Sequence, residues 1–68
     1  MKPLQKRWLR QIGETKDGRL GAHVTHRADQ NACEALLKAG LIKIDTAFEG
    51  GLFVIVITDA GRAALSAT

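Results

Sequence analysis

The stretch LFVIVITDAGRAAL, residues 52–65, joins an apolar, β-branched run directly to an alanine-rich segment. The run Leu52–Ile57 predicts a strand, and because it has no polar positions, both of its faces need cover. We expect helices on one face, and the last helix, a second subunit or a partner protein on the other. Thr58 is a typical helix N-cap and Asp59 suits the helix dipole. A short helix is therefore expected to close the core with its alanines and Leu65.

The residues before this run predict a second strand paired with it. Leu41–Asp45 alternates apolar and polar side chains, and the glycine-rich stretch Thr46–Gly51 predicts a loop, so together they predict a β-hairpin. Phe48 lies near the tip, where it is expected either to contact a partner protein or to fold back on the core. The loop contains no Lys or Arg that could bind a phosphate group, and the negative charge of Glu49 would repel one.

A helix is expected over Thr25–Ala39, ended by Gly40. Thr25 is one candidate N-cap, and Asn31 offers an alternative, later start. The spacing predicts a buried side made of Ala28, Ala32, Leu36 and Ala39, joined by Cys33 and Leu37. It predicts an exposed side with Arg27, Asn31, Glu34 and Lys38, with Gln30 nearby and a pair between Glu34 and Lys38.

The first residues predict another amphipathic helix. Pro3 suits a helix start, and Leu4, Trp8 and Ile12 recur every four residues over about ten residues, with Gly13 as the expected end. Trp8 is expected to anchor the core. Leu20–Val24 then alternates with period two and predicts a short strand, although a loop or one helical turn fits as well. The exposed flank of the helix carries Lys6, Arg7 and Arg10.

A length of 68 residues limits the chain, residues 1–68, to a single domain. A chain of this length has a thin margin of stability, so self-association is a reasonable source of further burial. Residues 1–30 carry seven Lys and Arg against three acids, a net +4, whereas residues 31–68 carry three against four, a net −1. A basic half on a small domain suits a polyanion or an acidic protein surface.

The sequence offers little for catalysis or metal binding. It has no paired carboxylates, nucleophile elbow or phosphate-binding glycine loop, so we expect no enzyme and no cofactor. His23, His26 and Cys33 match no recognised zinc spacing, and Cys33 is expected to be a buried structural thiol. A single cysteine suits a reducing compartment, and no secretory leader or membrane-spanning run is evident, so we expect a soluble, cytoplasmic protein with no membrane partner.

Two motifs resemble those of a known family. The sequence ALLKAGLI at Ala35–Ile42, a hairpin, and ITDAGRAAL at Ile57–Leu65 resemble the C-terminal half of bacterial and phage winged helix-turn-helix proteins. The resemblance covers about residues 25–65 and implies a winged-helix-like α+β fold. Its expected order is helix, strand, helix, strand, strand, helix, with a two- or three-stranded antiparallel sheet. The family usually has one more helix before its recognition helix, for which Gly13 to Thr25 leaves little room.

The resemblance also implies a function. Thr25–Ala39 corresponds to the recognition helix, so the expected protein is a small DNA-binding regulator of phage or prophage type that acts on double-stranded DNA as a homodimer. An alternative is a protein-interaction module that binds a partner through the hairpin and the basic first helix. The residues expected in the major groove are His26, Arg27, Gln30 and Asn31. Those expected at phosphates are Lys6, Arg7, Arg10 and Lys43, with Arg19 as a further candidate. Those expected at a partner or dimer interface are Phe48, Phe53 and Ile55.

Overall fold

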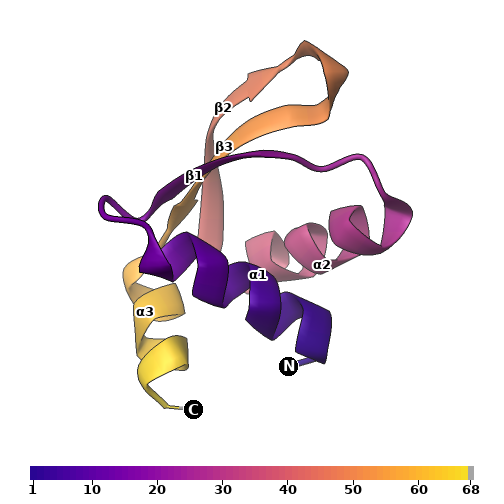
Figure 1. The fold of residues 1–68 in the computed structure, drawn as a ribbon. Helices are drawn as coiled ribbons and strands as arrows, with labels where there is room; N and C mark the ends of the chain where they lie inside the picture. The colour runs from indigo at the N-terminus through magenta and orange to yellow at the C-terminus, as the bar shows by residue number, and fades with distance from the viewer. Residues whose placement is uncertain (68) are drawn as a thin grey trace.

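The computed structural model describes residues 1–67 and has the α+β order expected from the sequence. Within residues 1–67, a single helix lies between the first and second strands. The additional helix that the resembled family usually has before its recognition helix is therefore not found there. Figure 1 shows the helices gathered on one side of the strands, with the end of the hairpin projecting away from them. The elements are α1 (Pro3–Glu14), β1 (Arg19–His23), α2 (Arg27–Lys38), β2 (Ile42–Phe48), the 3₁₀ turn η1 (Glu49–Gly51), β3 (Leu52–Ile57) and α3 (Asp59–Ser66).

The three strands form one antiparallel sheet with β3 in the centre, in the order β1-β3-β2. Ile55 of β3 is paired with Leu20 of β1 on one side and with Ile44 of β2 on the other. A bulge between Ile44 and Thr46 shifts the register of β2 and lets pairing continue as far as Phe48 and Leu52. Strand β2 therefore begins one residue later and ends three residues later than predicted, and the loop is correspondingly shorter.

The core lies between one face of this sheet and the helices. Its most deeply buried side chains are Leu9 and Ile12 of α1, Leu36 of α2 and Ile55 of β3. Each such side chain contributes roughly 1.5–3 kcal/mol when it leaves water. Helices α1 and α2 also pack directly on each other, so both are held against the same face of β3.

The opposite face of β3 is not covered by the last helix, which was one of the three expected covers. Arg19 and Lys43 flank Val56 in the register, so they share its face, away from the buried Ile55. Arg19 Nη2 lies 2.6 Å from Asp45 Oδ2, and this ion pair joins the two edge strands across the central one. Both side chains are about half exposed, so the pair adds at most about 1 kcal/mol. Helix α3 packs mainly against α1 instead of covering this face.

The predicted starts of α2 at Thr25 and at Asn31 are both wrong. The N-cap is His26, whose side chain makes no capping hydrogen bond. Instead, the Gln30 amide nitrogen donates to the carbonyl oxygens of Val24 and Thr25, each at 3.3 Å, and so ties the preceding link to the helix.

The C-terminal end of α2 follows the prediction. Gly40 has a φ of 74°, a conformation that favours glycine. Its N–H donates to the Leu37 carbonyl, and the N–H of Leu41 donates to that of Leu36, both at 3.0 Å. This pair of hydrogen bonds is a Schellman motif, and it directs the chain into β2.

The buried side of α2 is rotated relative to the prediction. Ala32, Cys33 and Leu36 are buried as expected, but Ala28 and Ala39 are exposed. Asp29 faces α1 instead, because Trp8 Nε1 donates a 3.0 Å hydrogen bond to its Oδ1 atom. Trp8 is half-buried and packs against the core, as predicted.

Two N-terminal boundaries also differ from the prediction. Gly13 lies within α1, which ends at Glu14, so it does not stop the helix. A Cβ atom at Gly13 would lie 2.6 Å from Leu65 Cδ1, which shows that the glycine allows α1 and α3 to approach closely. Strand β1 begins and ends one residue earlier than predicted, and Val24 lies beyond it, with its N–H bonded to the Gly51 carbonyl at 2.8 Å.

The join between β3 and α3 confirms Thr58 as the N-cap. The N–H of Gly61 donates to Thr58 Oγ1 at 3.1 Å, and the same hydroxyl donates to the Gly40 carbonyl at 2.6 Å. One threonine therefore caps α3 and ties it to the end of α2. Gly61 is buried against the Leu41 carbonyl and Ile57, so α3 sits directly on the start of the hairpin.

Replacing Gly61 is expected to destabilise the protein. In Gly61→Ala, the new Cβ would clash with the Leu41 carbonyl oxygen and lie 2.7 Å from Ile57 Cγ1, so we expect a loss of at least about 2 kcal/mol in the free energy of unfolding. Gly21→Ala is the matched control, because no heavy atom lies within 4 Å of its Cβ position, and we expect a change within about 0.5 kcal/mol. Urea denaturation measures both, and equal values for the two variants would contradict this packing.

Candidate nucleic-acid interface

The outward side of α2 carries a row of polar side chains. Arg27, Asn31, Glu34 and Lys38 follow one another at spacings of four, three and four residues, and all are exposed. Lys38 Nζ lies 3.5 Å from Glu34 Oε1, with side chains 78% and 63% exposed. A pair this exposed contributes only about 0.3–0.5 kcal/mol, so both side chains are free to exchange it for another partner.

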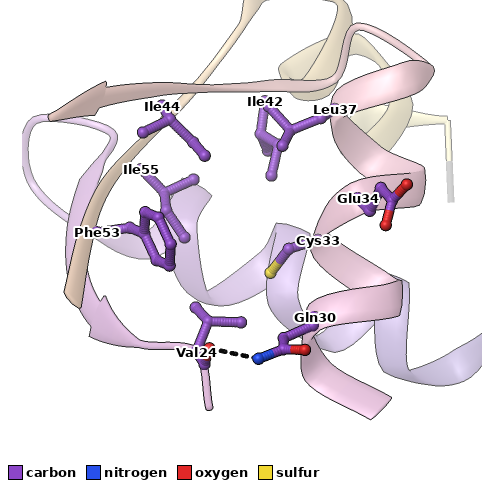
Figure 2. Close-up of a pocket in the computed structure, with 9 residues that line it drawn as sticks. All are labelled: Val24, Gln30, Cys33, Glu34, Leu37, Ile42, Ile44, Phe53 and Ile55. Atoms are coloured by element: carbon purple, nitrogen blue, oxygen red, sulfur yellow. Dashed lines mark hydrogen bonds between the residues drawn. The ribbon is translucent and has the colours of Figure 1, made fainter. Parts of the chain in front are cut away.

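The other two residues expected in the major groove are placed differently. Gln30 is exposed, but its amide is directed to the link between β1 and α2, where it donates to Val24 and Thr25. Figure 2 shows this hydrogen bond to Val24, on the side of the helix that faces the hairpin. His26 is exposed at the N-cap of α2, next to Arg27. The outward row therefore contains Arg27 and Asn31 but not the Gln30 amide.

Helix α1 adds positive charge beside α2. Lys6, Arg7 and Arg10 are exposed on the side of α1 that faces away from Leu9 and Ile12. The two helices also share two shallow hollows: Lys2 lines one together with Asn31, and Arg7 lines the other together with Asp29. Lys2 and Arg7 thus lie where α1 borders α2, whereas Lys6 and Arg10 line neither hollow.

Lys43 does not belong to this surface. It is exposed, but the register places it and Arg19 on the face of the sheet opposite the helices. A duplex bound along α2 would approach from the helical side, so these two residues lie away from it. Lys43 is therefore separated from α2, and its expected contact with phosphate stays a prediction.

The residues expected at a partner interface are divided between surface and core. Phe48 is 53% exposed at the end of the hairpin and pairs with Leu52, so it does not fold back on the core. Phe53 is half-buried and packs against the core. Ile55 is only 1% exposed, so the expectation that it forms an outward interface is wrong.

An apolar hollow of about 140 Å³ lies between α2 and the hairpin (Figure 2). It is smaller than the roughly 300–1,000 Å³ of typical ligand pockets, so it suits one side chain and not a cofactor. Ile44 is 41% exposed at this hollow and was missed in the sequence, because strand alternation shows which residues share a face but not where the helices leave it open. The lining residues are Val24, Gln30, Cys33, Glu34, Leu37, Ile42, Ile44, Phe53 and Ile55.

Cys33 lies in the wall of this hollow and is buried, as predicted. Burial, with the nearby Asp29 carboxylate as a smaller cause, raises the pKa of its thiol to about 11. Such a thiol is a poor nucleophile at neutral pH, because only the thiolate reacts. Among residues 1–67, no three His, Cys, Asp or Glu side chains come together in a way that could hold a metal ion.

No family model, curated protein or solved structure matches the chain. The winged-helix resemblance therefore rests on the motifs quoted above, and the function must be argued from the surface. Within residues 1–67, the helices are too short and too polar to cross a membrane.

Cys33 is expected to resist modification while the protein is folded. Its pKa of about 11, against an ordinary value of 9.0, leaves about a hundredfold less thiolate at pH 8. We therefore expect Ellman's reagent to react at least about fiftyfold more slowly with the native protein than with the protein in 8 M urea at the same pH. Equal rates in the two conditions would show that the thiol is not enclosed between α2 and the hairpin.

Proposed function

We propose that the protein is a small winged-helix-type DNA-binding module, a regulator of phage or prophage type that places α2 in the major groove. The observation that carries this proposal is the exposure of Arg27 and Asn31 on one side of α2, with Lys2 and Arg7 of the neighbouring α1 segment at the boundary between the two helices. Arg bonds the edge of guanine in two places, and Asn bonds adenine in the same way. These two side chains would supply sequence preference.

The basic side of α1 would supply affinity. Lys6, Arg7 and Arg10 are long, exposed cations on a rigid helix, and phosphate contacts of this kind fix the register of a protein on DNA. Each phosphate neutralised releases counterions, so binding must weaken steeply as salt is added. The net charge of +4 on residues 1–30 supports this role for α1.

A second candidate function, binding of a partner protein, is favoured by the hairpin. Phe48 and Ile44 are 53% and 41% exposed, and the apolar hollow beside Ile44 is the size of one side chain. Large apolar side chains exposed on one hairpin are a feature of protein interaction surfaces, and Ile44 also lines the hollow. The homodimer expected from the sequence stays a prediction, which sedimentation velocity at several protein concentrations would check.

DNA binding is measurable with a fluorescein-labelled 20-base-pair duplex and fluorescence anisotropy. We expect log Kd to rise with log salt concentration with a slope of roughly 3, from about three phosphate contacts, and the Lys6→Ala/Arg7→Ala/Arg10→Ala variant to remove most of that slope. Arg27→Ala and Asn31→Ala are expected to weaken binding to a preferred sequence by about 1–3 kcal/mol each.

Lys16→Ala is the charge-matched control for this experiment. Lys16 is exposed in the turn between α1 and β1, outside the proposed surface, so its removal should leave the salt slope unchanged. The proposal fails if the duplex is not bound at 50 mM salt, or if Lys16→Ala weakens binding as much as one substitution in α1. Phe48→Ala and Ile44→Asp should leave DNA binding unchanged, and a loss in both would favour the hairpin as the binding surface.

A further inference from the structure

We propose that Glu34 is a specificity-determining residue, and that α2 recognises a four-base-pair site in which a G·C pair, one unread pair, an A·T pair and a second G·C pair follow one another. This inference rests on the proposed function and names the target of the same surface. It assigns a role in DNA recognition to an acidic residue in the middle of the outward side of α2, where the simpler interpretation is a solvated carboxylate.

The spacing of the outward row matches the spacing of base pairs. An α-helix rises 1.5 Å per residue, so Arg27 and Asn31 are about 6 Å apart along the axis, and Asn31 and Glu34 are about 4.5 Å apart. The three residues therefore span about 10.5 Å, or about three base-pair steps of 3.4 Å, so they reach across four base pairs and leave the pair between the contacts of Arg27 and Asn31 unread. All three are exposed on the same side of α2, so a helix lying in the major groove presents them to neighbouring base pairs.

The side chains suit three different base edges. The Arg27 guanidinium matches the two acceptors of guanine, the Asn31 amide matches the donor and acceptor of adenine, and the Glu34 carboxylate accepts from the amino group of cytosine. Guanine and cytosine both mark a G·C pair, so the row recognises G·C, A·T and G·C at the first, third and fourth positions of the site, and these three recognised pairs form the triplet tested below. A carboxylate also rejects the wrong base, because the acceptor edges of guanine and thymine repel it.

In the structure the Glu34 carboxylate is available for this role, whereas the amide of the nearby Gln30 is not. The Gln30 amide is committed to the carbonyls of Val24 and Thr25, so it does not compete for the base next to Asn31. Figure 2 shows the Glu34 carboxylate directed away from the apolar side chains of the hollow. Its one ion pair in the structure, with Lys38, is long at 3.5 Å and exposed, so Lys38 can move to a phosphate when Glu34 bonds a base.

Selection from a pool of random 20-base-pair duplexes tests this assignment. The pool would be incubated separately with the wild-type protein, with Glu34→Ala and with Glu34→Gln. The duplexes that remain bound to each protein would then be sequenced. For the wild type we expect the triplet, with G·C favoured by at least about fivefold at the Glu34 position. In Glu34→Ala this preference should fall below about twofold, while the positions of Arg27 and Asn31 keep theirs. In Glu34→Gln it should change to A·T, because a Gln amide matches adenine.

Lys38→Ala is the matched control on the same side of α2. It removes the ion-pair partner of Glu34 and one charge, so it should weaken binding to all sequences alike and leave the triplet preference intact. Unchanged preferences at the Arg27 and Asn31 positions also show that each Glu34 variant is folded. The inference is overturned if the G·C preference survives both Glu34 substitutions, or if the wild type binds duplexes without preferring the triplet. In either case the proposed DNA binding would still stand. Absence of any retained duplex at 50 mM salt overturns both.

Discussion

Strand β3 is the element on which the rest of the structure depends, because it is paired along both edges and supplies the centre of the core. Ile55 has a strand partner on each side, and its side chain is buried together with Leu9, Ile12 and Leu36 of the helices. A 68-residue chain has few other places to bury apolar area. Removal of β3 from the sheet would separate β1 from β2 and leave both long helices without a surface to cover.

The position of β3 decides which surfaces the molecule presents. Because α1 and α2 pack on each other over one face of the sheet, the sides of both helices that point away from the core remain exposed. Helix α2 buries Cys33 and Leu36 against the core, and its orientation is accompanied by the hydrogen bonds from Trp8 to Asp29 and from Gln30 to the preceding link. In this orientation Arg27, Asn31 and Glu34 are exposed, and the Gln30 amide is already hydrogen-bonded.

Much of the fold could be predicted from short-range patterns, and the errors came from long-range contacts. The apolar run of β3, the Thr58 cap and the helix end at Gly40 each depend on neighbouring residues, and all three are confirmed. Gly13 was wrongly expected to end α1, because its role is to admit Leu65 from the far end of the chain. In the candidate site, helical spacing predicted the exposure of Arg27 and Asn31. It could not predict that Gln30 bonds Val24, or that the sheet turns Lys43 away from the helices, since both depend on how separate elements pack.

The most direct test of the central claim is a nuclear Overhauser measurement on the uniformly labelled protein in solution. The account predicts cross-strand contacts from Ile55 to both Leu20 and Ile44, together with contacts from the Ile55 methyl groups to those of the buried leucines of α1 and α2. If Ile55 shows contacts to Ile44 but none to Leu20 or to the helices, the hairpin stands alone. The arrangement that exposes Arg27, Asn31 and Glu34 would then be contradicted.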